Sequence, residues 1–360
     1  RQRYNAHQMP QVRLVDMKQE LRQGNATGLS GLLREELEEN LRRGEQSILF
    51  LNRRGNSRMV VCSQCGEVPT CPRCSVHLTY HSANGRLMCH YCGHSQPLPE
   101  LCPHCYGRLQ FVGMGTQKLQ EALEESYPGV EIMRMDADTI TATQSHEVLL
   151  DRFRWKQVPI LLGTQMVAKG LDFANVTLVG VVDGDLSLYA DNYRAAERTF
   201  SLLTQVVGRA GRGEKLGRAV IQTWTPDNDV INLAARQDYD TFYEEEREMR
   251  RMLRFPPFLD LFRITLSGPE ETQVLRACAV IRRSLEPWVK PRQQGPEGPE
   301  VLGPAPAPIL KVNNRYRYRV LLKCRNGREI RAILAQILQA AQQDRANRGL
   351  SNAMEVNPMD

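Results

Sequence analysis

The sequence lacks several features that would assign it to common classes. It contains no run of about 18 apolar residues, the minimum for a membrane-spanning helix, and its N-terminus has no apolar core of a signal peptide. We therefore expect a cytoplasmic protein that does not cross a membrane. It also has no GxxxxGK loop followed by Ser or Thr and no DExH or DExD box. Nucleotide hydrolases of the P-loop type need these motifs, so the chain alone is expected to lack that activity.

Aromatic residues are also scarce, at 6%, but an apolar content of 41% suits a globular protein with an ordinary core. A length of 360 residues allows two or three domains. The net charge of +6 is modest and unevenly distributed. Between Ile309 and Leu350, ten Lys or Arg residues stand against two acidic ones, a local charge of 10 − 2 = +8. This excess favours binding to phosphate backbones or to an acidic peptide; the alternative is a solvated surface.

Cysteines are few but concentrated. Eight of the ten form four C-x-x-C pairs, namely Cys62 and Cys65, Cys71 and Cys74, Cys89 and Cys92, and Cys102 and Cys105. Without a secretion signal, such a cluster favours metal binding over disulfides. Four thiolates complete a tetrahedral zinc shell, so the four pairs predict two zinc ions. Because such a shell leaves no open position, both ions are expected to be structural.

The spacing of the pairs favours a nested arrangement. Neighbouring pairs are separated by linkers too short for two knuckles to face one metal. Nesting gives an outer site, Cys62, Cys65, Cys102 and Cys105, and an inner site, Cys71, Cys74, Cys89 and Cys92. A crossed arrangement remains the alternative. Five histidines occur in the same stretch, but eight thiolates already fill two tetrahedra, so we expect none of them to be a ligand.

The remaining sequence predicts an α/β fold. Short Val/Ile/Leu-rich runs alternate with helical patterns up to about residue 225, which indicates a parallel sheet covered by helices on both faces. The cysteine block interrupts this alternation and is therefore an insertion. The predicted segments are a lobe formed by 1–58 and 109–225, with LQFVG at 109–113 among its strands, an insertion at 59–108, a linker helix within 226–257, and a small α+β C-terminal domain at 258–360. The Pro-rich stretch 291–308 is expected to be a loop.

Two segments resemble the second lobe of superfamily 2 helicases: ILLGTQMVAKGLDF, which begins at Ile160, and QVVGRAGRG, which begins at Gln205. A helix would place Gln205, Arg209 and Arg212 on one side, where two guanidinium groups can stabilise charge on a γ-phosphate. Gly208 and Gly211 would allow another backbone to come close.

The first of these segments follows a strand end, which is where ligands bind in parallel sheets. Gly170 begins a turn there, and Asp172 could hold a ribose hydroxyl or an arginine. We therefore predict that both residues help to bind the nucleotide.

Across all 360 residues the chain resembles the PriA family of bacterial replication restart helicases. The resemblance rests on SILFLNRRG, the four C-x-x-C pairs, GTQMVAKGLDF, QVVGRAGR, RFPPF and LGPAPAPILKVNNRYRYRVLLK. It implies a RecA-like lobe with an inserted two-zinc element, and an ATP- and Mg²⁺-dependent 3′-to-5′ helicase that binds abandoned replication forks and starts primosome assembly. It also implies nested zinc sites, and the implied partners are forked or single-stranded DNA, primosome proteins and the acidic C-terminal tail of the single-stranded DNA-binding protein. We expect a monomer.

The sequence departs from the family pattern in lacking the phosphate loop and acidic box. The chain is therefore expected to be a C-terminal fragment that supplies the arginine half of a split active site. The alternative is a non-enzymatic zinc-ribbon scaffold that binds nucleic acid. The stretch from Ile160 to Thr223 favours the helicase reading, because a scaffold has no use for paired arginines beside a strand end.

In the C-terminal region, RYRYRVLLK (315–323) alternates basic residues with aromatic and aliphatic ones. In a strand, this pattern gives one cationic face and one apolar face. The pattern fits either an amphipathic strand over a small core or a surface for DNA or an acidic tail. Arg328 and Arg331, on the helix expected to follow, would extend such a surface and are predicted to bind the partner tail.

Overall fold

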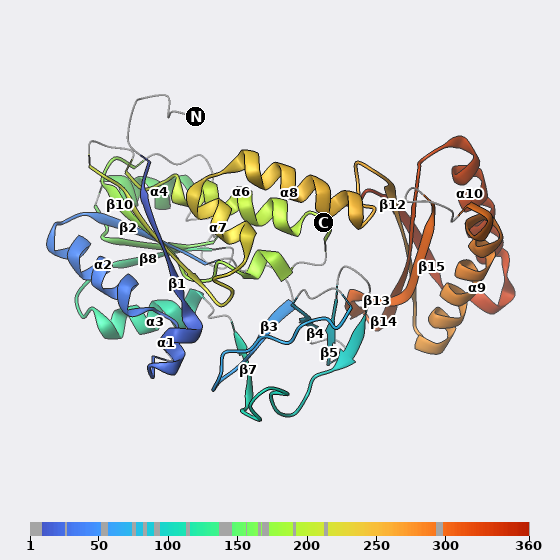
Figure 1. The fold of residues 1–360 in the computed structure, drawn as a ribbon, viewed down its shortest axis with the longest axis horizontal. Helices are drawn as coiled ribbons and strands as arrows, with labels where there is room; N and C mark the ends of the chain where they lie inside the picture. The colour runs from blue at the N-terminus through green and yellow to red at the C-terminus, as the bar shows by residue number, and fades with distance from the viewer. Residues whose placement is uncertain are drawn as a thin grey trace. The chain divides into compact units, whose positions relative to one another are not determined.

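The computed structural model describes residues 9–25, 27–51, 57–73, 77–81, 85–89, 94–112, 116–136, 146–155, 157–164, 167, 173–189, 192–211, 215–292 and 298–359. The chain divides into two compact units. The first unit comprises residues 1–69, 99–190 and 195–242, and the second comprises residues 70–98, 191–194 and 243–360 (Figure 1). Within the described residues, no helix has the length and apolar character needed to span a bilayer.

The first unit is built on a six-stranded parallel sheet. Its strands, in spatial order, are β1 (Gln11–Asp16), β11 (Arg218–Thr223), β10 (Val176–Val181), β2 (Gln46–Phe50), β9 (Ile160–Gly163) and β8 (Ile132–Met135). In β2 and just after it, Ile48 and Phe50 belong to one hydrophobic cluster, whereas Leu49 and Leu51 belong to another. This alternation places a core on each face of the sheet.

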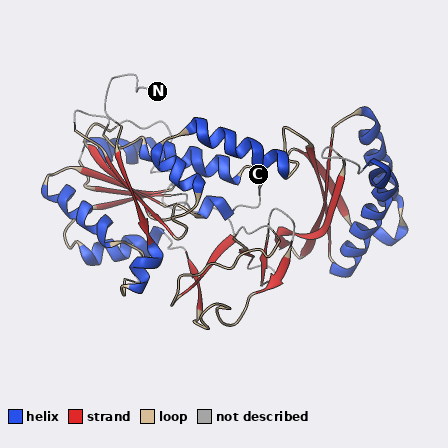
Figure 2. Ribbon diagram, viewed as in Figure 1, coloured by secondary structure: helices blue, strands red, loops and turns tan. Residues whose placement is uncertain are grey.

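Helices cover both faces (Figure 2). On one face lie α2 (Gly31–Arg42) and α3 (Thr116–Ser126), and on the other lie α4 (His146–Trp155), α6 (Ala195–Val207) and α7 (Asp229–Arg236). The short helices α1 (Met17–Arg22) and η1 (Leu186–Tyr189) follow β1 and β10. The predicted α/β fold with a doubly covered parallel sheet is therefore confirmed.

Two details of the predicted organisation are wrong, one in the lobe and one in the linker helix. The run LQFVG forms β7 (Leu109–Val112), but β7 pairs antiparallel with β3 (Ser57–Cys62) and does not belong to the parallel sheet. Both strands are short apolar runs, so composition does not reveal their partner. The predicted linker helix is two helices, because Gln237 adopts a left-handed conformation between α7 and α8 (Tyr239–Met252).

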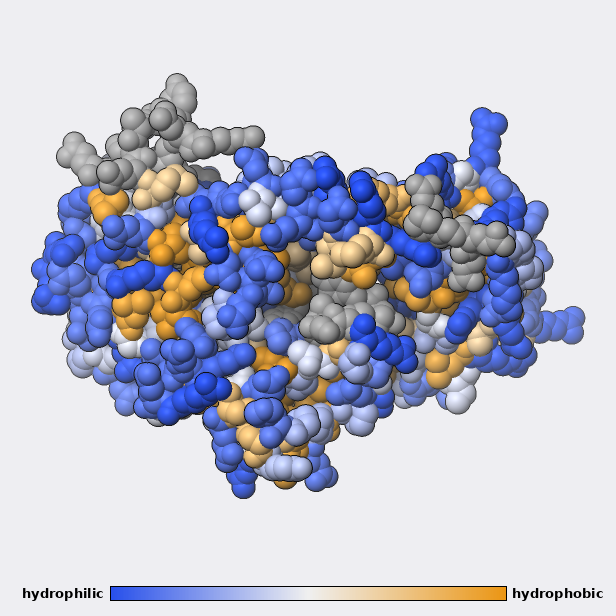
Figure 3. All heavy atoms as spheres, in the orientation of Figure 1, coloured by the Kyte–Doolittle hydropathy of each residue, from blue (hydrophilic) through white to orange (hydrophobic). Residues whose placement is uncertain are grey.

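The second unit contains an antiparallel sheet near the C-terminus. Its strands, in order, are β13 (Glu300–Val312), β14 (Arg315–Cys324), β12 (Asp260–Gly268) and β15 (Ser351–Val356). The helices α9 (Glu271–Val289) and α10 (Arg328–Gln343) pack on one face of it, with η2 (Lys290–Arg292) and η3 (Arg345–Asn347) beside them. In the face of the molecule that Figure 3 shows, the outward surfaces of α9 and α10 are mainly hydrophilic.

The expectation of a loop over 291–308 is wrong, because β13 begins at Glu300. This strand lies at the edge of its sheet, where proline is tolerated. Pro304, Pro306 and Pro308 alternate, so their missing N–H groups fall on one side of the strand and the intervening residues can still pair. The second unit also holds a small antiparallel meander of β4 (Thr79–His81), β5 (Arg86–Met88) and β6 (Ser95–Pro97).

Candidate zinc centre and arginine turn

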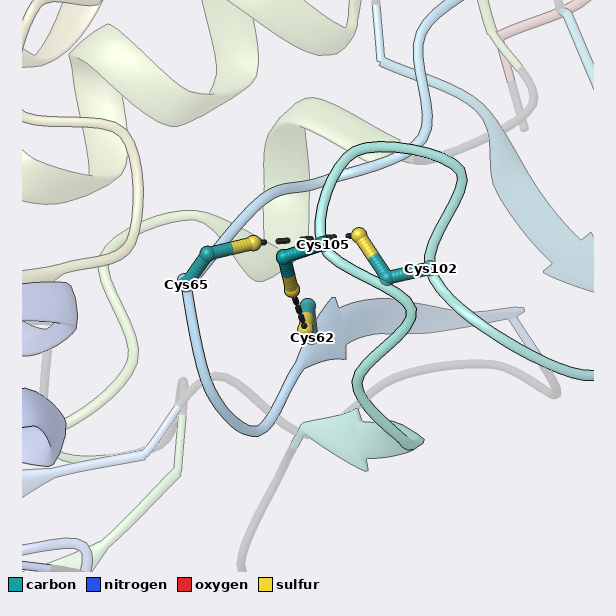
Figure 4. A group of neighbouring side chains, drawn as sticks. All are labelled: Cys62, Cys65, Cys102 and Cys105. Carbon is teal, nitrogen blue, oxygen red and sulfur yellow. Dashed lines mark hydrogen bonds between the residues drawn. The ribbon is translucent and has the colours of Figure 1, made fainter.

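Four cysteine side chains meet at the end of the β3–β7 pair. They are Cys62 and Cys65 on one side and Cys102 and Cys105 on the other, and Figure 4 shows their sulfur atoms turned toward one another. All four Sγ atoms lie within 4.8 Å of one another, with 3.4 Å between Cys62 and Cys105 and 3.7 Å between Cys65 and Cys102. A tetrahedron with Zn–S bonds of about 2.3 Å has edges of about 3.8 Å, so these residues fit a zinc ion.

The two pairs sit in turns with the same backbone hydrogen bonds. In the first knuckle (residues 62–67), Cys62 N donates to Glu67 O at 2.8 Å and Gly66 N donates to Cys62 O at 3.0 Å. In the second knuckle (residues 102–107), Cys102 N donates to Gly107 O at 2.8 Å and Tyr106 N donates to Cys102 O at 2.9 Å. The repeated pattern presents both thiols of each pair to a common centre.

Backbone amides also contact the sulfur atoms. Gln64 N lies 3.4 Å from Cys62 Sγ, and His104 N lies 3.4 Å from Cys102 Sγ. Burial opposes ionisation of Cys62, but amide donors and its thiol neighbours outweigh burial and lower its pKa to about 7. Burial, followed by the thiols of Cys105, Cys62 and Cys102, raises the pKa of Cys65 to about 12. The thiols of Cys62 and Cys65 therefore do not ionise together, and a divalent cation between them would favour both thiolates.

The predicted inner zinc site is described in part. Cys71 and Cys89 are both buried, and Cys89 N donates to His94 O at 2.8 Å. Cys74 and Cys92 lie outside the described residues. In the described part of the chain, the group whose atoms could hold a metal consists of the four outer cysteines and includes no histidine.

The predicted arginine residues follow α6. Gln205 is exposed on the helix and donates through Nε2 to Ser201 Oγ at 3.0 Å. The helix ends at Val207, so Arg209 lies beyond it, and the expectation that a helix places Gln205 and Arg209 on one side is wrong. Arg209 is half-buried in the turn formed by 208–211, which we call the arginine turn. Arg212, Gly170 and Asp172 lie outside the described residues.

Close backbone packing holds the arginine turn against the sheet. Gly211 has a φ of +67°, and its N–H donates to Val176 O at 3.0 Å. A Cβ atom on Gly211 would lie 2.3 Å from Gly217 N, and one on Gly217 would lie 2.5 Å from Ala210 C. Glycine is therefore required at both positions, and the turn is pressed between the starts of β10 and β11.

Two buried aspartates at the carboxyl end of β10 were not singled out from the sequence. Asp185 accepts hydrogen bonds from Thr223 Oγ1 and Trp224 N, both at 2.8 Å, and from Thr225 Oγ1. Burial, followed by the charge of Asp185, raises the pKa of Asp183 to about 8. The signal available in the sequence is a pair of acidic residues directly after an apolar strand.

The basic strand β14 does not present a free cationic face. Arg319 and Lys323 are 8% and 3% exposed. Lys323 Nζ donates to Leu253 O at 2.8 Å and lies 4.2 Å from the centre of the Phe255 ring. The apolar face matches the prediction, because Tyr318, Val320 and Leu322 belong to the core under α9 and α10.

The two arginines predicted to bind the partner tail lie at the start of α10. Arg328 and Arg331 are both exposed, and Arg331 Nε donates to Asn326 Oδ1 at 2.7 Å. Within the second unit, the side chains of both arginines are therefore accessible to a binding partner.

Three family models match the chain: the Primosomal protein N C-terminal domain at residues 251–359, the PriA DNA helicase Cys-rich region domain at 71–97, and the Helicase conserved C-terminal domain at 106–214. The chain is 43% identical to the replication restart protein PriA of Bacillus subtilis over 357 residues, which cover 99% of the chain and 44% of that protein. It is also 43% identical to the PriA of Synechocystis sp. over 327 residues, 89% of the chain and 39% of that protein. The chain thus spans less than half the length of these relatives.

Among solved structures, Saccharomyces cerevisiae Dbp5 bound to RNA and ADP BeF3 is similar at 16% identity and a TM-score of 0.33, covering 68% of this chain and 45% of Dbp5. The structure of the C-terminal domain of the DEAD-box protein Dbp5 is similar at 14% identity and a TM-score of 0.30, covering 60% and 89%.

Proposed function

Because the chain belongs to the PriA family and corresponds to its C-terminal part, we propose that it forms the second motor lobe, the zinc-binding insertion and the C-terminal domain of a replication restart helicase. The intact protein would be an ATP-dependent 3′-to-5′ DNA helicase that recognises abandoned replication forks and initiates primosome assembly. We further propose that this protein is a monomer, that it is cytoplasmic, and that it binds forked or single-stranded DNA.

The observation that carries the motor proposal is the placement of the arginine turn. The turn follows α6 and packs between the starts of β10 and β11. It therefore holds Arg209 at the amino end of these two parallel strands. A guanidinium held by rigid backbone can stabilise charge that develops on a γ-phosphate without reorganising at the moment of reaction.

The active site is proposed to be split. ATP and Mg²⁺ would bind to a lobe that carries the phosphate loop, and this chain would close over them. Arg209 and Arg212 would neutralise charge on the transferred phosphoryl group, with Gln205 on the same surface, and Gly170 and Asp172 would contact the nucleotide. Since the sequence has no phosphate loop, the 360-residue chain alone should not hydrolyse ATP.

The test of the motor proposal is alanine substitution of Arg209 and, separately, of Arg212 in the intact protein. Each should lower DNA-stimulated ATP turnover by about 1,000-fold, the scale of losing an arginine finger, and leave DNA affinity unchanged. Arg198→Ala is the matched control, because Arg198 is an exposed arginine on α6. Turnover within a few-fold of the wild type in both variants would refute the motor role and leave a DNA-binding scaffold.

We further propose two structural zinc ions, one in the outer site and one in the inner site formed by Cys71, Cys74, Cys89 and Cys92. The fit of the outer thiols to a tetrahedron supports the first, and the match of 71–97 to the PriA Cys-rich region supports the second. Each zinc would be closed by four thiolates and would hold the insertion together. Elemental analysis in reductant should find two zinc ions per chain, and fewer would count against the assignment.

Arg328 and Arg331 are proposed to bind the acidic tail of the single-stranded DNA-binding protein. The proposal rests on their exposure and on the local excess of positive charge. Reversing both charges, Arg328→Glu with Arg331→Glu, should weaken binding of a tail peptide by at least about tenfold. Arg276→Glu with Arg283→Glu makes the same charge change at exposed positions of α9 and serves as control. Equal losses in the two double variants would show a general charge effect and remove the assignment.

A further inference from the structure

The helix α1 contacts the backbone of the first knuckle. Arg22 Nη2 donates to the carbonyl oxygen of Cys65 at 2.6 Å, although the two residues are 43 positions apart. Gly66 has a φ of +73°, and a Cβ atom there would lie 2.7 Å from Cβ and Cγ of Lys18. A side chain at position 66 would therefore collide with α1. These two contacts join α1 to the turn that supplies half of the outer zinc ligands.

The helix α1 is itself fixed to the parallel-sheet lobe. Asp16, the last residue of β1, accepts a hydrogen bond from Lys18 N at 2.8 Å and caps the helix. Met17 is 3% exposed and belongs to the core beneath α2. Glu20 Oε2 accepts hydrogen bonds from Asn25 Nδ2 at 2.5 Å and from Gly31 N at 3.0 Å, which ties α1 to the start of α2. A helix held at both ends in this way cannot shift without disturbing the lobe.

The opposite end of β1 contacts the segment that packs on the arginine turn. Gln11 N donates to Gly217 O at 2.9 Å, and Gly217 lies directly against Ala210 and Gly211. From there β1 pairs in unbroken register with β11, from Gln11 opposite Arg218 to Asp16 opposite Thr223. The strand is about 20 Å long, so it connects two regions that are distant within the same unit.

We propose that residues 11–22, the β1–α1 bridge, couple the outer zinc site to the arginine turn. Zinc binding orders the first knuckle, the knuckle holds Arg22 and Lys18, and β1 carries that constraint to Gly217 and the turn. Because coupling between two sites is reciprocal, order in the turn also stabilises zinc binding at the outer site. Arg22 is a positioning residue in this scheme, since it acts through the backbone of Cys65. The inference rests on the proposed outer zinc, but it does not depend on helicase activity.

The first experiment measures zinc release from the purified 360-residue chain to a chromogenic chelator. In Arg22→Gln, one of the two zinc ions should leave about fivefold faster, the scale of losing one hydrogen bond, while the other keeps its wild-type rate. Arg22→Lys should restore part of the effect because it keeps a donor. Repeating the measurement in a background with Cys71→Ser and Cys89→Ser identifies the faster ion as the outer one. Arg43→Gln is the control, because Arg43 also makes one exposed hydrogen bond, to Glu39.

The second experiment follows amide hydrogen exchange at Gln11 and Gly211. Both amides donate hydrogen bonds in the structure and should exchange about fivefold faster in Arg22→Gln and after removal of the outer zinc. Amides of β9, which lies on the far side of the sheet from β1, should not change. Faster zinc release with unchanged exchange at Gln11 and Gly211 would overturn the coupling. Unchanged zinc release in Arg22→Gln would overturn the bridge as a whole, whereas a chain that binds fewer than two zinc ions would instead contradict the proposed zinc sites.

Discussion

The two knuckles of the outer zinc site have the same backbone hydrogen bonds but carry different residues at one equivalent position. Gly66 and Tyr106 both donate to the carbonyl of the first cysteine of their knuckle, and both have a positive φ, +73° and +59°. The space beside Gly66 is filled by Lys18 of α1, whereas the Tyr106 side chain is 77% exposed. The first knuckle is therefore fastened to the lobe, and the second extends into solvent.

This difference separates what the zinc turn requires from what its surroundings require. The turn needs a left-handed residue, a conformation that costs a non-glycine residue roughly 1–2 kcal/mol. In the second knuckle that cost is borne by a tyrosine. In the first knuckle contact with α1 excludes any side chain, so glycine is the residue that fits. The second knuckle in turn packs on the first, since a Cβ atom on Gly107 would lie 2.9 Å from Cys62 Sγ.

The largest expected effect comes from removing a ligand, which should abolish the difference between the knuckles. Cys62→Ser and Cys105→Ser change one knuckle each, yet both variants should lose the outer zinc entirely. Both should also unfold the insertion, because structural zinc contributes folding energy of about 10 kcal/mol in small modules. Zinc analysis and limited proteolysis would measure this. Retention of the outer zinc by either variant would show that three thiolates suffice and would contradict the tetrahedral assignment.

The next largest effect is expected when the first knuckle receives the tyrosine that the second knuckle has at the equivalent position. Gly66→Tyr should destabilise the zinc-loaded first unit by about 3 kcal/mol, from left-handed strain and collision with Lys18. Gly129→Tyr is the matched control, because Gly129 has a φ of +81° and nothing within 4 Å of a built Cβ, so strain alone applies. Denaturant unfolding would compare them. Equal losses in the two variants would mean that α1 contributes nothing to the intolerance at position 66.

The contrast also shows what the sequence can predict. The parallel strands are short apolar runs and can be predicted from the sequence. Ser30, a residue type that favours helix N-termini, caps α2, since Leu33 N donates to its Oγ at 3.2 Å. The C-x-x-C spacing likewise indicates metal ligands. The contact of Arg22 with Cys65 depends on residues 43 positions apart, and no local pattern encodes it.

Errors elsewhere have the same physical origin. The prolines of β13 predict a loop, because proline lacks the N–H group that a central strand needs. The structure accommodates them because β13 is an edge strand. The spacing of Gln205 and Arg209 suggests that one helix carries both, but α6 ends at Val207 and the following turn packs Gly211 against Gly217. Local composition thus predicts elements well, whereas their partners and their ends depend on what packs against them.

A substitution at Asp183, away from both knuckles, changes the stability of the parallel sheet without touching either knuckle. The pKa of Asp183 is raised from 3.8 to about 8 by burial and Asp185, so its neutral form stabilises the fold below about pH 4 and that contribution is lost as pH rises toward 8. The wild type should lose up to roughly 1.4 kcal/mol per pH unit in this window. Asp183→Asn should show a flatter profile in unfolding experiments from pH 5 to 8.

If the two knuckles differ only through their own contacts, the gap between Gly66→Tyr and Gly129→Tyr should be the same in the Asp183→Asn background. A gap that shrinks in that background would show that stability of the sheet, and not the contact with Lys18, sets the cost at position 66. An unchanged pH profile in Asp183→Asn would mean that this carboxyl does not titrate in the folded chain as its burial predicts.

The smallest effect is the reverse exchange at the second knuckle. Tyr106→Gly should stabilise the zinc-loaded unit by about 0.5–1 kcal/mol, because it removes left-handed strain and an exposed side chain. Tyr106→Ala keeps the strain and should be close to neutral, which makes it the control for loss of the ring. Thermal unfolding of both variants would rank them. A loss of stability in Tyr106→Gly would show that the ring supports the knuckle. The expected gain would instead show that left-handed strain at Tyr106 lowers the stability of the second knuckle.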